Sequence, residues 1–280
     1  MKHIFLAILF YFSLYEDLTC QELMRNGSFE IVDESPNAYR FLAKNWYIQN
    51  GTSVDYFSKR ISSQSKIYGV PMNFLGYHPS IDGDAYCGLV LFSWNCCDYE
   101  LLTGSLMKSL QKDSIYFISF MLKYAGDSII LNSKEIYIYF SNDSSNLVMS
   151  NCYSGNYCDL IDNIGIAINI DSVNRSNDWV NCSILYKAKG FERFVTIGLI
   201  TKNNETLKKK NKEFRKLIES KASLEKIKKF VESNTLYPIG LNEKCIINDR
   251  KKYLYRTYSY YFLDKFSIMP YIESNYTIEK

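Results

Sequence analysis

The order of apolar and polar residues along the chain predicts a series of short β-strands separated by turns. Residues 86–94 form an almost continuous apolar run, typical of a buried strand, and residues 98–106 continue as a second strand. Residues 115–124 are rich in Ile, Tyr and Phe, and residues 135–141 alternate as a half-buried strand does. Further strands are predicted at residues 26–33, 179–188, 191–200 and 258–268.

The segments between these strands differ in character. Lys189-Gly190 separates two of the predicted strands and is a hairpin turn signal. Residues 49–83 have the glycine and proline content of a loop, but their length favours a functional surface or a lid over a passive connection. Residues 203–235 are dense in Lys and Glu, and their apolar residues recur at helical spacing. We therefore expect a helical insertion here, whose lysines form a solvated face or contact a partner.

Together these patterns predict an all-β fold. Eight or nine short strands with turns between them favour a two-sheet antiparallel β-sandwich, or jelly roll, with the lysine-rich helical insertion before the last strand. One domain covering residues 21–280 accommodates all of them.

Composition adds little to the fold but bears on the compartment. The chain has 280 residues with a net charge of +3, which does not demand a nucleic-acid partner. Residues 1–20 begin with a basic residue, continue with an apolar run at 4–14 and end with polar residues, which is typical of a secretory signal peptide. The run is too short to span a bilayer, and we place cleavage before Gln21. A lipoprotein acylated at Cys20 and an uncleaved N-terminus are the alternatives, so the protein is expected to be secreted or to lie at the cell surface.

The chain contains eight cysteines. Cys152 and Cys158 flank a turn-rich loop, which makes them the best disulfide candidate in an oxidising compartment. If Cys20 leaves with the signal peptide, an odd number remains, and at least one thiol is free or pairs with another chain.

Few residues suit catalysis. The two histidines are His3, within the predicted signal peptide, and His78, which is expected to be an exposed loop residue. Asp82 and Asp84 offer paired carboxylates of the kind that hydrolyse glycosides, although Asp and Gly also serve turns for backbone reasons alone. No nucleophile elbow, zinc motif or phosphate loop is present, so we expect a protein that is not an enzyme.

A set of short motifs gives a family resemblance. In order, the motifs are Asn26-Gly27-Ser28-Phe29-Glu30, Trp46, Asp55-Tyr56-Phe57, Val70-Pro71-Met72-Asn73-Phe74-Leu75-Gly76-Tyr77, Gly83-Asp84-Ala85-Tyr86-Cys87-Gly88 and Tyr260-Tyr261-Phe262-Leu263-Asp264. With this set, the chain resembles the galactose-binding-like jelly rolls of secreted bacterial surface proteins, which are related to carbohydrate-binding modules, from Asn26 to Ile268 apart from the insertion.

The resemblance implies a structural calcium ion where the two ends of the domain meet. In related modules, the Glu of the first motif and an Asp of the last strand hold the ion, and these positions are Glu30 and Asp264 here. Calcium takes six to eight oxygen ligands, so main-chain oxygens and water would have to complete the shell. The family often has two consecutive Asp residues in the last strand, whereas this chain has Lys265 at the second position.

Aromatic residues of the long loop and its surroundings are the candidates for ligand contacts. Sugar rings pack their C–H faces on aromatic rings, while fixed polar groups bind the hydroxyls. The predicted ligand contacts are Trp46, Tyr56, Phe57, Asn73, Tyr77, Asp84 and Trp94. The alternative is that the aromatic rings fill the core of the sandwich.

The sequence thus favours a non-catalytic, secreted or cell-surface binding module with a carbohydrate or cell-surface polymer as its ligand. A structural or adhesive domain that binds a protein partner through its loops or helical insertion is the second reading, and a carboxylate-based glycoside-acting enzyme is the third. The ligand's identity and the oligomeric state are left open.

Overall fold

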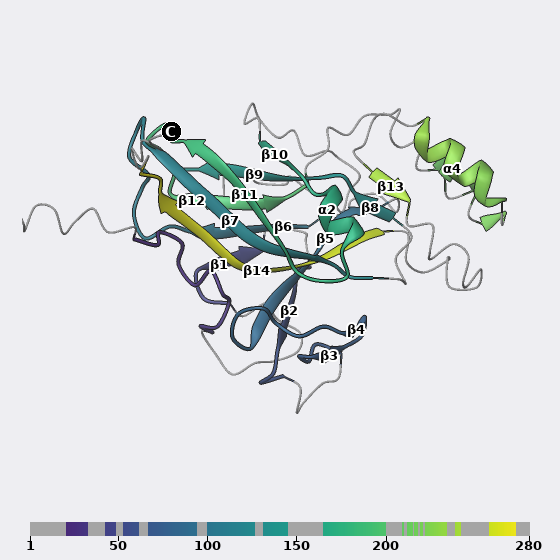
Figure 1. The fold of residues 1–280 in the computed structure, drawn as a ribbon, viewed down its shortest axis with the longest axis horizontal. Helices are drawn as coiled ribbons and strands as arrows, with labels where there is room; N and C mark the ends of the chain where they lie inside the picture. The colour runs from purple at the N-terminus through teal and green to yellow at the C-terminus, as the bar shows by residue number, and fades with distance from the viewer. Residues whose placement is uncertain are drawn as a thin grey trace, which may run out of the picture.

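The computed structural model describes most of the predicted strands (Figure 1). Residues 1–20, and with them the predicted signal peptide and Cys20, lie outside the described residues, as do Trp94, Cys152 and Cys158. The described residues are 21–32, 43–48, 53–61, 67–93, 100–126, 131–144, 165–199, 209, 212–214, 216–217, 219–220, 222–233, 239–241 and 258–272.

Two five-stranded antiparallel sheets form the body of the molecule, so the predicted all-β sandwich is confirmed. The first sheet has the order β1-β6-β12-β9-β10, with bounds Trp46–Ile48, Leu101–Ser105, Phe194–Gly198, Glu135–Ser141 and Ile166–Asn169. The second has the order β11-β7-β14-β5-β2, with bounds Val180–Lys187, Ile115–Tyr124, Tyr258–Pro270, Ala85–Ser93 and Asp55–Ser58.

Smaller elements decorate the sandwich. The strands β3 (Met72–Asn73) and β4 (Gly76–Tyr77) form a hairpin within the long loop, and β8 (Leu131–Ser133) pairs with β13 (Ile239–Leu241). The short helix α2 (Asp171–Arg175) precedes β11. The second described helix, α4 (Leu224–Glu232), confirms the helical part of the predicted insertion.

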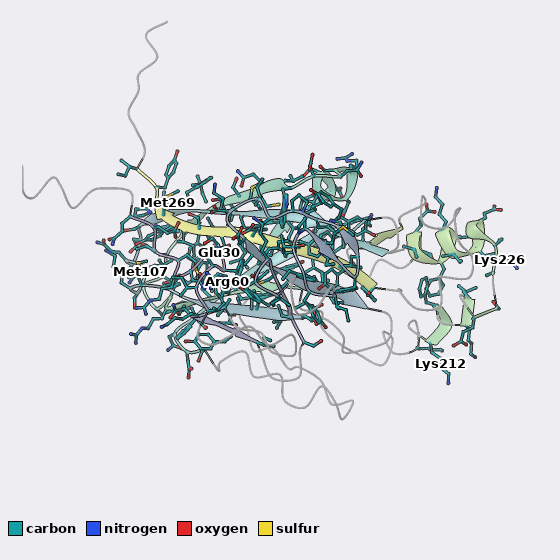
Figure 2. All side chains as sticks on the ribbon, turned by 90° about the horizontal axis from the view of Figure 1, so that it is seen from below. Glu30, Arg60, Met107, Lys212, Lys226 and Met269 are labelled. Carbon is teal, nitrogen blue, oxygen red and sulfur yellow. The ribbon has the colours of Figure 1, made fainter. Side chains whose placement is uncertain are left out.

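The helix α4 lies at one end of the molecule, beside β13 and away from the two sheets (Figures 1 and 2). Its apolar residues Ile227 and Val231 are buried, and Phe230 packs on the buried Phe214 with ring centroids 5.7 Å apart. Ser223 accepts a hydrogen bond from the Lys226 backbone N–H at the helix start. No helix among the described residues is long and apolar enough to cross a membrane.

The predicted hairpin around Lys189-Gly190 is wrong. β11 pairs with β7 over eight residues in the second sheet, whereas β12 lies between β6 and β9 in the first. The turn therefore carries the chain from one sheet to the other. Gly190 takes a φ of +94°, and both oxygens of the Glu192 carboxylate accept backbone N–H groups from Lys189 and Gly190. Strand partners distant in sequence determine the pairing here, and the local turn signal does not.

The predicted first strand, residues 26–33, is also wrong. Residues 26–32 form a tight loop with positive φ at Asn26 and Phe29. Within the described part of the chain, the strand-like links of this segment are the isolated bridges Met24–Leu106 and Val32–Ala43. The expected neighbour is nevertheless present, because Leu23 N–H donates to Ile268 O and Phe266 N–H donates to Gly27 O. The two ends of the domain therefore lie side by side.

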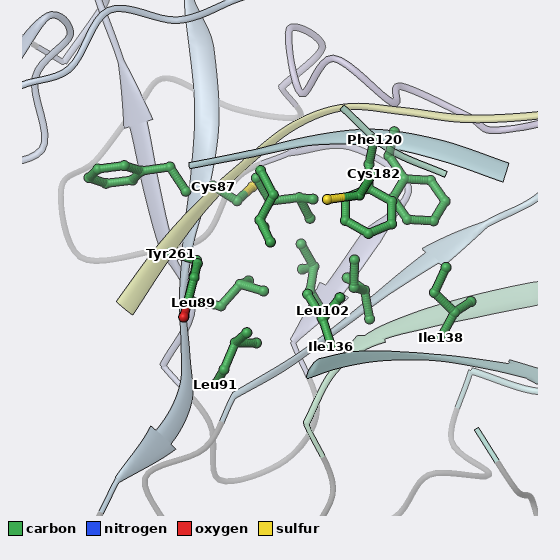
Figure 3. Packing of buried hydrophobic residues seen from close by; sticks show 14 of the residues in the cluster. Cys87, Leu89, Leu91, Leu102, Phe120, Ile136, Ile138, Cys182 and Tyr261 are labelled. Carbon is green, nitrogen blue, oxygen red and sulfur yellow. The ribbon is translucent and has the colours of Figure 1, made fainter. Parts of the chain in front are cut away.

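One continuous core fills the space between the sheets (Figure 3). Cys87 and Leu89 of β5 point inward, as do Phe120 of β7 and Tyr261 of β14, and residues of the opposite sheet such as Leu102, Ile136 and Ile138 face them across the core. Both Cys87 and Cys182 are buried free thiols, as expected for cysteines within apolar strands. The same cluster extends onto the outward face of the second sheet, where Phe57, Tyr86 and Phe262 are buried.

Candidate functional site

Two carboxylates from opposite ends of the domain hold one turn. Glu30 Oε1 accepts the backbone N–H groups of Asp84 and Ala85, at 2.7 and 2.8 Å. Asp264 Oδ2 accepts those of Ile81 and Asp82, at 3.2 and 3.1 Å. The turn at residues 81–85 therefore lies between Glu30 and Asp264, and Figure 2 shows Glu30 beside the yellow strand β14.

The first motif of the sequence builds this arrangement. The Asn26 side chain accepts the Ile31 N–H and donates to Ile31 O and Lys44 O, which holds the tight loop. A Cβ at Gly27 would lie 1.8 Å from Phe266 O, so only glycine allows the loop to approach β14. Phe29 is fully buried, which anchors the loop and fixes the neighbouring Glu30.

Asp264 sits at an irregularity in β14. The register of β14 against β7 shifts between Asp264 and Ser267, and Lys265 takes a φ of +51°. At this bulge Asp264 is fully buried against the 81–82 backbone, while Lys265 is exposed. Burial raises the pKa of the Asp264 carboxyl to about 7, against backbone hydrogen bonds from Asp82, Lys265 and Ile81 that lower it.

The donor chemistry of this arrangement is compatible with calcium. Glu30 and Asp264 supply carboxylate oxygens, and the N–H groups that they accept leave lone pairs on both groups. Within the described residues, no group of three or more His, Cys, Asp or Glu side chains is placed to hold a metal ion. Main-chain oxygens would therefore have to supply most of the ligands.

Three of the predicted aromatic contacts are packed into the interior. Trp46, Tyr56 and Phe57 are at most 5% exposed. Trp46 Nε1 donates to Asn26 O, and the Tyr56 hydroxyl donates to Phe29 O, so both polar atoms serve the loop that carries Glu30. Their rings do not line an open groove in this structure, and packing of this kind favours the structural role that the sequence left open.

The predicted polar contacts are used internally as well. Asn73 is buried, donates to the Tyr86 hydroxyl and accepts the Leu75 N–H. Asp84 forms an ion pair with Lys59, and both side chains are about half exposed. Asp82 and Asp84, the pair considered for glycoside hydrolysis, thus flank Gly83 in the turn whose backbone N–H groups bond to Glu30 and Asp264.

Tyr77 differs from the other predicted aromatic contacts. It is 66% exposed on β4 and pairs across the hairpin with Met72, which is 56% exposed. Gly76, with a φ of +126°, allows the tight return of the hairpin, and His78 N–H donates to Pro71 O at 2.6 Å. The structure therefore presents Tyr77 to solvent on a backbone that is held by hydrogen bonds. Trp94 lies outside the described residues and stays a prediction.

His78 is not the exposed loop residue that the sequence suggested. It is 8% exposed and packs against Phe262 with ring centroids 4.7 Å apart. Its Nδ1 atom is buried without a hydrogen-bond partner, and its Nε2 atom lies 3.4 Å from Leu75 O. Burial and the charge of Lys123 lower the pKa of this imidazole. The long loop folds back over the sheet and covers the ring.

The outward face of the second sheet carries an aromatic layer that the sequence analysis did not assign. Phe262 of β14 contacts Phe57 and Tyr86 at 5.4 and 5.0 Å between ring centroids. Trp179, immediately before β11, contacts Tyr86 edge-on at 5.6 Å, and its Nε1 donates to Pro79 O. Trp179 is only partly buried, so it forms the outer limit of this layer. The missed signal was a tryptophan at the start of a predicted strand.

A second pair of carboxyl groups with raised pKa values consists of Asp55 in β2 and Glu100, which immediately precedes β6. Asp55 accepts the Tyr260 hydroxyl at 2.5 Å, and Glu100 accepts Val90 N–H and the Ser53 hydroxyl. Burial raises the pKa of Glu100 to about 8 and that of Asp55 to about 6. Glu100 is 5% exposed, and its acceptor atoms are occupied by protein groups, which is the environment of a structural carboxyl group.

No family model and no curated protein matches the chain. Among solved structures, it is similar to the CBM22-1 xylan-binding domain of Xyn10C from Paenibacillus barcinonensis, at 11% identity and a TM-score of 0.39, over 90% of this chain and 95% of that one. It is similar to the CBM22-1 and GH10 modules of xylanase 10B from Clostridium thermocellum, at 8% identity and a TM-score of 0.37, over 91% of this chain and 29% of that one.

A third similar structure is the K1 cleaved adhesin domain of Lys-gingipain from Porphyromonas gingivalis, at 10% identity and a TM-score of 0.35, over 90% of this chain and 99% of that one. The similar structures thus include carbohydrate-binding modules, the class that the sequence motifs resemble. Likenesses this distant carry no argument about the ligand, which must come from the residues of this chain.

Proposed function

We propose that this protein is a non-catalytic, secreted or cell-surface binding module whose ligand is a carbohydrate. The observation that carries the proposal is the exposed ring of Tyr77 on a hairpin with a fixed backbone. Pro79, two residues later, is held by the partly exposed Trp179. Both rings are thus supported by the segment 77–79, and aromatic faces on a rigid backbone suit the C–H faces of sugar rings.

Replacing Tyr77 by alanine tests this proposal. We expect Tyr77→Ala to weaken glycan binding about tenfold or more, because a stacked ring contributes about 1–2 kcal/mol, while the melting temperature changes little for so exposed a side chain. A glycan array followed by calorimetry on the best ligand measures both. Tyr47→Ala is the matched control, since Tyr47 is an exposed tyrosine of β1 in the other sheet. A folded protein that binds no polysaccharide contradicts the proposal.

A protein-binding, adhesive role is the second candidate, and one observation favours it. Met72 and Tyr77 face solvent as a cross-strand pair, and Ile67 nearby is 53% exposed. Phe74 N–H donates to Ile67 O, which places this residue beside the hairpin. Two exposed apolar side chains on the hairpin and a third beside it suit a protein contact as well as a sugar ring. A negative glycan array would leave this reading in place.

We also propose a structural calcium ion held by Glu30 and Asp264. The support is that these two carboxylates approach one turn from opposite ends of the domain. We expect calorimetry to detect calcium binding by the full chain and to detect none with Glu30→Ala. Asp113→Ala is the control, because this exposed aspartate pairs with Lys187 and does not contact the 81–85 turn. Identical titrations of the wild type and Glu30→Ala would remove the site.

A further inference from the structure

Lys123 of β7 is a buried lysine on the outward face of the second sheet. It is 6% exposed and stands opposite Phe262 of β14 in the register of the two strands. Among the described residues, no hydrogen-bond acceptor or ion-pair partner faces its ammonium group. Burial lowers the pKa of Lys123, and this effect is larger than that of the Asp178 charge, which favours the charged form of the lysine.

The ammonium group of Lys123 nevertheless reaches solvent. His78 Nδ1 and Ser259 Oγ are the described side-chain atoms that are both buried and unpaired, and Lys123 Nζ is not among them. The stem of the lysine is therefore covered while its tip opens to the surface. Long basic side chains often bury an aliphatic stem in this way. Here the tip finds no carboxylate within the described protein, which leaves it available to an anion from solution.

Trp179 and His78 both pack against Phe262, the residue opposite Lys123 in the sheet. Trp179 precedes Val180, which pairs with Leu122, so the tryptophan stands next to Lys123 across β11 and β7. Its ring lies 6.5 Å from Phe262, and its Nε1 is committed to Pro79 O, so the ring orientation is fixed. His78 packs on the other side of Phe262, close enough for the charge of Lys123 to lower its pKa.

We propose that Lys123 and Trp179 form a subsite for a uronic acid residue, so that the ligand is an acidic polysaccharide. This inference rests on the proposed carbohydrate-binding function and names its ligand class. The Lys123 ammonium pairs with the sugar carboxylate, and the exposed part of the Trp179 ring packs on the pyranose C–H face. Asp178 accepts a sugar hydroxyl. His78 is a positioning residue, since it supports Phe262 beneath the lysine and does not contact the ligand.

Burial of the Lys123 stem bears on the stability of the protein. It disfavours the charged form of the side chain, and an apolar side chain of similar length at such a position is often neutral or stabilising. Lys123 stands opposite Phe262 of β14 and lies between the buried Leu122 and Tyr124 of β7. A charged residue at a position that suits an apolar one points to a role in binding.

The test compares polygalacturonate with its fully methyl-esterified form, which has the same sugar backbone without the charge. We expect the full-length protein to bind polygalacturonate at least about tenfold more tightly, with an affinity that falls as salt is added. Lys123→Met should remove this preference and leave the melting temperature unchanged or raised. Lys187→Met is the matched control, because Lys187 is exposed and already pairs with Asp113 at 3.2 Å.

A second readout reports on the geometry. NMR titration should show that the pKa of His78 rises when polygalacturonate binds, because the ligand carboxylate offsets the charge of Lys123. The methyl ester should not produce this rise, and Lys123→Met should raise the pKa without any ligand. His3 is the only other histidine, so the signals can be assigned.

The outcomes separate the two proposals. Equal binding of both polymers, or an acidic preference that survives Lys123→Met, overturns the uronate subsite and leaves carbohydrate binding standing. Equal binding of polyglutamate and polygalacturonate also overturns it, because charge alone would then explain the affinity. A folded protein that binds neither polymer and no neutral glycan overturns the carbohydrate function and the subsite together.

Discussion

Gly27→Ala is expected to lower the free energy of unfolding by about 3 kcal/mol, because the new methyl group has no space. Its Cβ would lie 1.8 Å from Phe266 O, a backbone atom that is fixed within β14. The loop must then move away from the strand, which breaks the hydrogen bond from Phe266 N–H to Gly27 O and displaces Glu30 from the 81–85 turn. Urea denaturation followed by tryptophan fluorescence measures the loss.

Gly126→Ala provides the control for Gly27→Ala. Gly126 has a φ of +101°, but a Cβ there would meet nothing within 4 Å. Only backbone strain opposes this substitution, so we expect a loss of about 1 kcal/mol. If both variants lose the same small free energy of unfolding, the loop does not approach β14 tightly and glycine is not required at position 27.

Glu100→Gln is expected to stabilise the protein at pH 8 by about 2 kcal/mol and to leave stability at pH 5 nearly unchanged. Burial raises the pKa of Glu100 from 4.5 to about 8, so between these values the folded state holds a proton that the unfolded state has released. Wild-type stability therefore falls as the pH rises through this window. A glutamine keeps both contacts, because its oxygen accepts Val90 N–H and its nitrogen donates to the Ser53 hydroxyl.

Glu192→Gln should behave in the opposite way. Burial alone would raise the pKa of Glu192, but hydrogen bonds from Tyr186 and from the backbone of Lys189, Glu192 and Gly190 outweigh it and lower the pKa. The charged form is thus favoured by folding, and its loss should destabilise the protein throughout pH 5–9. Urea denaturation at several pH values tests both variants. A wild-type stability that does not fall between pH 5 and 8 would contradict the assignment for Glu100, given that Asp55 and Asp264 contribute in the same direction up to about pH 6 and pH 7.

The strands could be predicted from sequence where the pattern is local. β7 and β9 have the predicted bounds 115–124 and 135–141. A run of β-branched and aromatic residues predicts a strand even when the strands that pair with it are unknown. The turn at Lys189-Gly190 was recognised, but the sheets that it connects were not. Which strands pair depends on segments that are far apart in the sequence, as the pairing of β11 with β7 shows. The residues of a turn do not determine this pairing.

The site was less predictable than the fold. Trp46 and Phe57 were chosen as ligand contacts because large aromatic side chains serve cores and binding sites alike, and only packing distinguishes the two. Glu30 and Asp264 bond the same turn at residues 81–85, because their motif positions follow from the closure of the domain, while their role as metal ligands stays a prediction. Lys123 was missed because it stands within an apolar strand, where its lack of a partner is visible only once its neighbours across the sheet are known.

The position of β14 has a consequence for biosynthesis. This strand is the last in chain order among the described elements, yet it lies between β7 and β5 at the centre of its sheet. A ribosome must therefore extrude the chain through β14 before the second sheet can close, and until then β5 and β7 expose strand edges that would otherwise be paired. Nascent chains that stall before residue 258 should consequently depend on holding chaperones in a way that chains containing β14 do not.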